Sequence, residues 1–154
     1  MFIENVSRDD IIKGNHSDPS NAILIQISDP GVSHPTPKKK FKEVYQLNFL
    51  DADESDVTGE ISSKRFPWDP PSLFTCNYED LITPTQAEYL CKILTSAIDD
   101  KHDVIVHCHA GVCRSGAVVE VGAILGFEPT NRRHRIPNTM VKRRMMQYLG
   151  LTYE

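Results

Sequence analysis

The chain has no run of apolar residues long enough to cross a membrane, and its N-terminus lacks the pattern of a secretory signal peptide. It has only four cysteines, and their spacing fits neither the disulfide framework of a small secreted domain nor a zinc site. They are Cys76, Cys91, Cys108 and Cys113. Internal repeats and low-complexity tracts are also absent from the sequence. These absences predict a cytoplasmic protein that keeps its thiols reduced, contains no metal site and does not act at a membrane.

The size and composition are those of one globular domain. The chain has 154 residues, of which 40% are hydrophobic and 25% charged, and we expect a single domain over residues 1–154. The net charge is −4, but positive charge gathers in one segment without acids, residues 132–144. It carries Arg132, Arg133, Arg135, Lys142, Arg143 and Arg144. This segment could attract acidic phosphopeptides or RNA. A solvated basic surface is the simpler interpretation, so we do not expect a nucleic acid partner.

Hydrophobic periodicity and turn residues divide the chain into alternating strands and helices. The predicted strands cover residues 22–27, 44–49 and 103–107, and the predicted helices begin near Thr83, Ser115 and Asn138. Thr83 and Gln86 form a capping box, and Gly126 is a plausible end for the second helix. Such alternation predicts an α/β fold with a mainly parallel central sheet flanked by helices. Ligands bind such sheets at the carboxyl ends of the strands.

One stretch of ten residues combines a strand end, a tight loop and a helix start around a cysteine. It reads His107-Cys108-His109-Ala110-Gly111-Val112-Cys113-Arg114-Ser115-Gly116 and follows the apolar run Val104-Ile105-Val106. In such a loop successive backbone N–H groups point inward, and the helix N-terminus adds unpaired donors and partial positive charge. The sequence therefore predicts a phosphate-binding loop between strand and helix. Its members would be His109, Ala110, Gly111, Val112, Cys113 and Arg114.

The side chains of this loop have the chemistry for phosphoryl transfer. Donors around the sulfur of Cys108 favour the thiolate, which can attack phosphorus and form a phosphocysteine intermediate. Arg114 supplies a planar fork for two phosphate oxygens. Ser115 is placed to donate a hydrogen bond to the departing sulfur. His107 is expected to point away from the pocket and to support the loop.

The pattern His-Cys-x-x-Gly-x-x-Arg-Ser, between His107 and Ser115, resembles the signature of the cysteine-dependent protein tyrosine phosphatases, including the dual-specificity branch. Every defining position of that signature is matched. The resemblance implies a small, single-domain, dual-specificity-like phosphatase that needs neither a metal nor another cofactor. Its partner would be a phosphorylated protein or peptide substrate. The resemblance covers roughly residues 20–150, and its specificity is concentrated in residues 104–116.

The family also uses an aspartate on a loop upstream of the cysteine strand as the general acid. Asp51 and Asp53 follow the strand predicted at residues 44–49, so they should lie at the edge of the sheet where the phosphate loop opens. Small bacterial relatives with a Phe-x-Asp pattern after this strand look similar, and we therefore favour Asp51. Asp69, in Trp68-Asp69-Pro70, is a third candidate, although the mobile loop of larger tyrosine phosphatases reads Trp-Pro-Asp.

The sequence thus predicts a phosphoprotein phosphatase that acts on phosphotyrosine, with phosphoserine and phosphothreonine as further candidate substrates. Three other functions of Cys-x5-Arg loops stay open: removal of RNA 5′-phosphates, arsenate reduction, and phosphopeptide binding without turnover. The basic segment favours the first, and the additional cysteines favour the second. The presence of both Cys108 and Arg114 argues against the third.

Overall fold

The computed structural model describes residues 1–52 and 80–152. Within this part of the chain five strands form one sheet in the order β3-β2-β4-β1-β5, and every neighbouring pair is parallel. The strands are β1 (Phe2–Ser7), β2 (Ala22–Ser28), β3 (Glu43–Asn48), β4 (Asp103–Cys108) and β5 (Glu128–Pro129). The predicted α/β fold with a parallel central sheet is confirmed.

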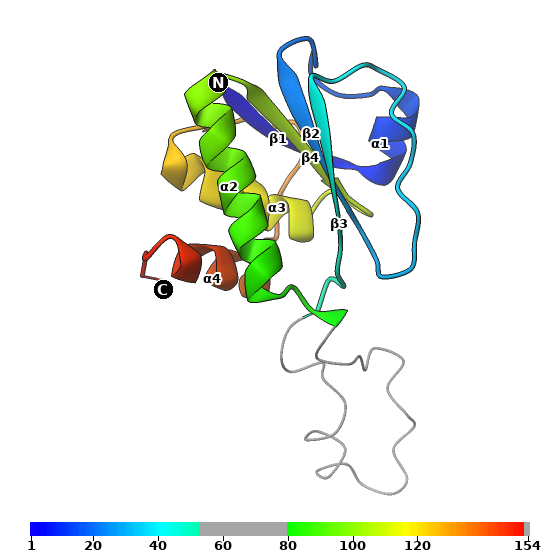
Figure 1. The fold of residues 1–154 in the computed structure, drawn as a ribbon. Coiled ribbons are helices and arrows are strands. Elements are labelled where there is room, and N and C mark those ends of the chain that lie inside the picture. The colour runs from blue at the N-terminus through cyan, green and yellow to red at the C-terminus, as the bar shows by residue number, and fades with distance from the viewer. Residues whose placement is uncertain (53–79, 153–154) are drawn as a thin grey trace, which may run out of the picture.

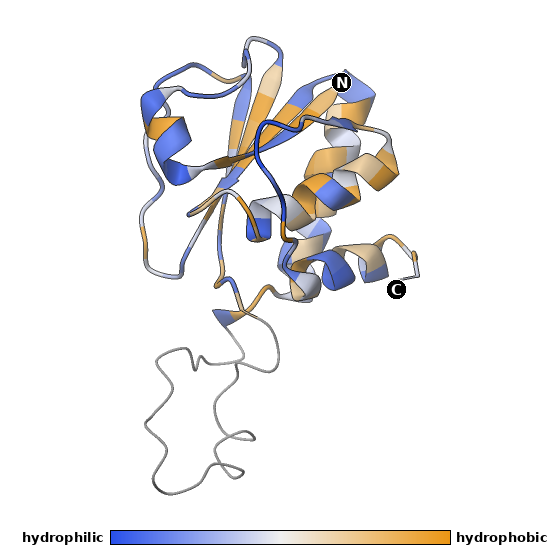
Figure 2. Ribbon diagram, turned by 180° about the vertical axis from the view of Figure 1, so that it is seen from behind, coloured by the Kyte–Doolittle hydropathy of each residue, from blue (hydrophilic) through white to orange (hydrophobic). Residues whose placement is uncertain are grey.

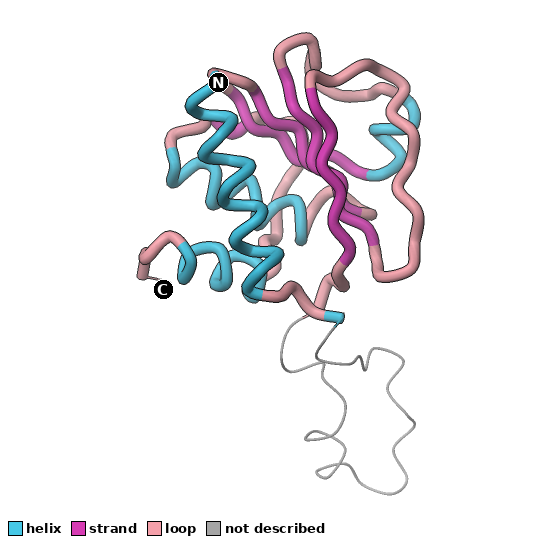
Figure 3. Tube along the Cα trace, in the orientation of Figure 1, coloured by secondary structure: helices cyan, strands magenta, loops and turns pink. Residues whose placement is uncertain are grey.

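Helices cover both faces of the sheet (Figures 1 and 3). The described helices are α1 (Arg8–Lys13), α2 (Pro84–Asp100), α3 (Arg114–Leu125) and α4 (Thr139–Tyr148). α1 lies on one face, whereas α2, α3 and α4 lie together on the other. Two apolar cores result, a small one around Ile11 of α1 and a larger one that includes Leu94 of α2 and Met145 of α4. No helix in the described part is both long and apolar enough to cross a bilayer.

β2 and β4 are buried and mostly apolar because both of their faces are covered. Every residue of β2 is buried, and β4 is buried from Val104 onward. Figure 2 shows this as hydrophobic colouring along the strands. Continuous apolar runs are typical of strands in parallel sheets, which explains why the sequence alone located both of them.

β1 is not among the predicted strands, because buried polar residues interrupt its apolar pattern. Glu4 is fully buried, and its carboxylate accepts hydrogen bonds from Ser17 and Thr130. β1 lies between β4 and β5, and Ser7 is in register with Cys108. The end of β1 therefore lies beside the end of the cysteine-bearing strand.

The helix boundaries agree with the predicted capping residues. Thr83 and Gln86 form a reciprocal capping box at the start of α2. Gly126 ends α3 in the left-handed conformation, with φ of 116°. Asn138 caps α4, because its side-chain oxygen accepts a hydrogen bond from the backbone N of Val141 at 3.0 Å.

Candidate active site

Cys108 ends β4 and Arg114 begins α3, so residues 109–113 form a tight loop at the carboxyl edge of the sheet. The Cys108 side chain is buried. Its Sγ lies 3.2 Å from Oγ of Ser115 in the first turn of α3. The structure therefore brings together the cysteine and the hydroxyl that the sequence proposed as reaction partners.

The carbonyl groups of this loop point away from its centre. Each carbonyl from residue 109 to residue 113 accepts a hydrogen bond from a donor outside the loop. In chain order these donors are the backbone N of Arg8 (3.1 Å), Nη1 of Arg133 (3.2 Å), Nδ2 of Asn5 (2.6 Å) and the backbone N atoms of Ile136 (3.2 Å) and Asn138 (3.0 Å). A planar trans peptide directs its N–H opposite to its C=O. The N–H groups of residues 110–114 therefore point inward.

These inward N–H groups have no acceptor in the part of the chain that the structure describes. Among residues 1–52 and 80–152, no hydrogen bond is donated by the backbone N–H groups of residues 110–114. Unpaired N–H groups that converge on one point form an anion-binding concavity. The N-terminus of α3 adds partial positive charge at the same place. The loop thus has the geometry of an anion-binding site.

Gly111 allows the loop to lie directly against β1. Its φ of 75° is in the left-handed region, where side chains are disfavoured. A Cβ atom at this position would also lie only 2.4 Å from the carbonyl carbon of Val6 and 2.5 Å from the N of Ser7. Because both are backbone atoms of a sheet strand, they cannot easily move aside. Only glycine fits here without displacing the loop from the strand.

The buried guanidinium of Arg114 is held by the protein along one edge and left open along the other. Its Nη1 donates to Oδ1 of Asp29 at 2.7 Å and to the carbonyl oxygen of Phe49 at 2.8 Å. Nε is buried, and neither Nε nor Nη2 donates to any group in the described part of the chain. A guanidinium edge with two parallel N–H groups matches the spacing of two phosphate oxygens. Arg114 is thus oriented, with a bidentate edge available.

Asp51 lies beside the loop, just beyond the end of β3. Its Oδ1 accepts a hydrogen bond from Nδ2 of Asn138 at 2.8 Å. Burial, followed by the nearby Asp51 carboxylate, raises the pKa of the Cys113 thiol. Asp51 therefore lies close to the last residue of the loop. The other two candidate acids, Asp53 and Asp69, lie outside the described residues.

His107 is fully buried at the end of β4. Its Nδ1 lies 3.3 Å from the carbonyl oxygen of Cys108, and Nε2 has no hydrogen-bond partner among the described residues. Burial lowers the pKa of His107 to about 4, so the imidazole is neutral at pH 7. Its hydrogen bond reaches only Cys108 at the end of β4, whereas Asn5, Arg8 and residues 133–138 hold the loop itself.

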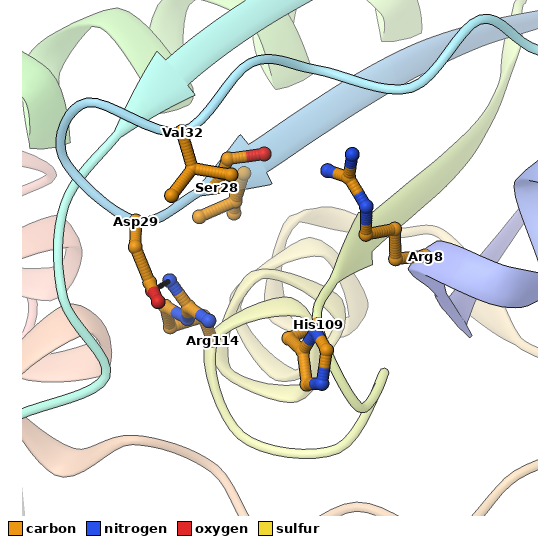
Figure 4. Close-up of a pocket in the computed structure, with 7 residues that line it drawn as sticks. Arg8, Ser28, Asp29, Val32, His109 and Arg114 are labelled. Atoms are coloured by element: carbon orange, nitrogen blue, oxygen red, sulfur yellow. Dashed lines mark hydrogen bonds and ion pairs between the residues drawn. The ribbon is translucent and has the colours of Figure 1, made fainter.

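A pocket of about 310 Å³ opens beside the loop, where β2 and β4 end (Figure 4). It is lined by Arg8, Ile27, Ser28, Asp29, Val32, His109 and Arg114. Two of these, His109 and Arg114, belong to the predicted phosphate-binding loop. The pocket therefore offers space for the organic group of a phosphate ester next to the site where its phosphoryl group would bind.

Sequence reasoning missed several residues that build this site. Asn5, Arg8 and Asp29 contact the loop or its arginine, yet each is more than 75 residues away from them along the chain and belongs to no local motif. Arg133 was expected to lie on a solvated surface, but its Nη2 forms an ion pair with Asp10 at 2.7 Å and its Nη1 holds the loop. Asn138 was expected only as a helix cap, and it also binds Asp51.

Residues 74–126, which include the whole loop, match the protein family described as "Polymorphic toxin system, DSP-PTPase phosphatase". No match was found among curated proteins. Solved structures that resemble the chain include OH1, a tyrosine phosphatase from the Orf virus. It has 16% sequence identity and a TM-score of 0.44, and the similarity covers 80% of this chain and 55% of OH1.

A mouse protein described as a dual specificity phosphatase, solved with zinc tungstate, is also similar. It has 16% identity and a TM-score of 0.38, over 82% of this chain and 58% of the mouse chain. The protein thus spans less than two thirds of the length of either structure. The family match spans the Cys108–Arg114 loop and supports the predicted resemblance to the cysteine-dependent tyrosine phosphatases of the dual-specificity type.

Proposed function

We propose that the protein hydrolyses phosphotyrosine in proteins or peptides through a phosphocysteine intermediate, with phosphoserine and phosphothreonine as secondary substrates. The family match supports protein phosphatase activity in general. The mechanism and the preference for tyrosine are inferred from the site. The observation that carries the proposal is the set of outward carbonyls from residue 109 to residue 113, since it leaves the opposing N–H groups free around Cys108.

In the first step the Cys108 thiolate attacks phosphorus and forms the S–P bond, while the bond between phosphorus and the ester oxygen breaks. Asp51 donates its proton to that oxygen, and the alcohol or phenol leaves. The inward N–H groups and the free edge of Arg114 stabilise the charge on the non-bridging oxygens of the transition state. Because these groups supply the positive charge, the proposed reaction needs no metal ion.

In the second step water attacks the phosphocysteine. The Asp51 carboxylate accepts a proton from this water, the S–P bond breaks, and inorganic phosphate is released. Oγ of Ser115, 3.2 Å from Sγ, donates a hydrogen bond to the departing thiolate. Both catalytic groups return to their starting protonation states.

The proposal is tested by Cys108→Ser, assayed with p-nitrophenyl phosphate and with a phosphotyrosyl peptide. Serine keeps the shape of cysteine but is not ionised at neutral pH, so turnover should be lost while calorimetry still detects peptide binding. Cys91→Ser is the matched control, because this buried cysteine lies on α2 and contacts the carbonyl of Met145. It should retain turnover, and EDTA should not inhibit. Activity that persists in Cys108→Ser would overturn the mechanism.

The same proteins test the other functions of Cys-x5-Arg loops. Faster release of phosphate from 5′-phosphorylated RNA than from the peptide would favour an RNA phosphatase. Thioredoxin-dependent consumption of arsenate would favour a reductase. Peptide binding by the wild type without any turnover would indicate a recognition module.

The description of the matched family also supports a second, cellular proposal, a role in a polymorphic toxin system. Such a role would depend on turnover rather than on binding. Induced expression of the wild type should then stop growth of a sensitive host cell, whereas Cys108→Ser, expressed to the same level, should be harmless. Equal growth of the two strains would remove this second proposal but not the first.

A further inference from the structure

Arg8 is held in a fixed position relative to the phosphate-binding loop. It follows β1 directly and begins α1, and its backbone N donates to the carbonyl of His109 at 3.1 Å. Its side chain lines the pocket beside the loop. In Figure 4 Arg8 and Arg114 lie on opposite sides of this pocket, with His109 below and between them. The pocket thus has a second guanidinium, away from the one that faces the phosphoryl site.

No carboxylate in the described part of the chain balances the charge of Arg8. Its Nη1 donates to the neutral carbonyl of Ser33 at 2.9 Å, and it forms no ion pair within residues 1–52 and 80–152. By contrast, Arg114, Arg132 and Arg133 each form an ion pair with an acid. Arg8 is only half-buried, so its side chain remains accessible from the pocket. Arg8 is therefore a cation without an acidic partner among the described residues, on the wall of the candidate active site.

The wall between the two cations is partly apolar. Ile27 and Val32 line it, and Val32 remains 44% exposed although it is hydrophobic. Apolar side chains beside an anion site suit the ring of a phosphotyrosine better than the polar ribose of a nucleotide. The pocket thus combines an anion-binding loop, an apolar wall and a second cation.

We infer that Arg8 binds a second anionic side chain of the substrate, next to the phosphotyrosine whose phosphoryl group occupies the loop. This inference rests on the proposed phosphatase function and names its substrate class: phosphotyrosyl peptides with an adjacent acidic or phosphorylated residue. A carboxylate and a second phosphate offer the same chemistry, an anion for the Arg8 guanidinium, and a phosphate can be bound by two parallel hydrogen bonds. Binding of either would select among substrates rather than contribute to the chemical step.

The test uses three phosphotyrosyl peptides that differ only in the residue after the phosphotyrosine. That residue is alanine, glutamate or a non-hydrolysable phosphonate analogue of phosphothreonine. In the wild type, kcat/KM for the glutamate peptide should be about 3-fold higher than for the alanine peptide, as expected for a half-exposed ion pair. For the phosphonate peptide kcat/KM should be about 10-fold higher or more, because a phosphonate can form charge-assisted, bidentate hydrogen bonds with the guanidinium. Raising the salt concentration should reduce both ratios.

In Arg8→Gln both ratios should fall to about one, and in Arg8→Lys they should be intermediate, because lysine keeps the charge but not the planar fork. Each ratio is taken within one variant, so a general change in activity cancels. Lys13→Gln is the matched control, since Lys13 is a cation at the other end of α1 that pairs with Asp9. It should leave both ratios unchanged.

Three results would overturn the inference: equal kcat/KM for all three peptides in the wild type, ratios that survive in Arg8→Gln, or a 5′-phosphorylated dinucleotide that is hydrolysed faster than every peptide. Turnover of p-nitrophenyl phosphate, which has one anionic group, is measured in parallel. If the wild type does not hydrolyse it, the proposed function itself fails. If the wild type does hydrolyse it, the kcat/KM ratios of the peptides test only the inference about Arg8.

Discussion

The side-chain amide of Asn138 donates to Oδ1 of Asp51 at 2.8 Å, while its side-chain oxygen caps α4 and its backbone N holds the carbonyl of Cys113. One residue therefore joins the candidate general acid, the phosphate-binding loop and the last helix. Asp51 itself is exposed and follows the end of β3. The contact with Asn138 helps to hold Asp51 beside the loop.

Asp51→Asn should lower kcat on aryl phosphates by about 10²- to 10⁴-fold, because the amide cannot protonate the leaving group. Asp53→Asn and Asp69→Asn, measured in parallel, should have little effect on kcat. A loss of kcat confined to one of those two variants would identify that residue as the general acid.

Asn138→Ser should separate the positioning role of Asn138 from its capping role. Serine caps helices about as well as asparagine, so the melting temperature should change little. It cannot reach Asp51 with an N–H donor, and we expect kcat to fall about tenfold with little change in KM, because a slightly misplaced acid loses efficiency. Thr83→Ser, at the cap of α2, is the control and should not alter kcat. Normal kcat in Asn138→Ser would show that Asp51 is positioned by other contacts.

Gly111→Ala should destabilise the protein more than Gly31→Ala, although both glycines have nearly the same φ, 75° and 78°. A Cβ at Gly31 would meet nothing within 4 Å, so only the backbone conformation costs free energy there, about 1–2 kcal/mol. At Gly111 the contacts with Val6 and Ser7 add about 1–3 kcal/mol. Urea unfolding measures the difference, and only Gly111→Ala should also lose activity. Equal stability of the two variants would mean that the loop can move away from β1.

The free energy of unfolding should decrease as the pH falls from about 6.5 to about 4. Burial lowers the pKa of His107 from 6.5 to about 4, so in this range the unfolded chain binds a proton that the folded protein excludes. The stabilisation is therefore complete above pH 6.5 and is lost toward pH 4, by up to about 3 kcal/mol. His107→Asn removes the titrating group and should flatten this part of a urea-unfolding pH series. An unchanged slope in the variant would contradict the assignment.

The sequence predicts this fold best where a single segment contains its own information. β2, β4 and α3 each contain an apolar run, and the capping residues of α2 and α4 lie directly before the helices that they start. β1 was not predicted because Glu4 interrupts its apolar pattern. The burial of Glu4 depends on hydrogen bonds from Ser17 and Thr130, which are distant from it in sequence. Local patterns do not show such partners.

The residues of the candidate site also fall into two groups, those that a local motif reveals and those that only the strand order brings together. Cys108, Arg114 and Ser115 are recognisable because the loop and the helix start place them by chain geometry alone. Asp29 reaches Arg114 only because β2 and β4 are neighbours in the sheet, and Arg8 reaches His109 only because β1 lies on the other side of β4. The order of the strands in the sheet decides these contacts. The sequence predicted only three strands and not β1, so it could not determine that order.

The donors that hold the five loop carbonyls also determine at which stage of synthesis and folding the loop is complete. Arg133, Ile136 and Asn138 are synthesised after the Cys108–Arg114 motif, so a nascent chain that already contains the complete motif lacks three of those donors. Until this later segment folds back, the N–H groups of the loop are not aligned to bind a phosphoryl group. A folding intermediate should therefore be chemically inert, and phosphatase activity should appear together with the last cooperative step of folding rather than before it.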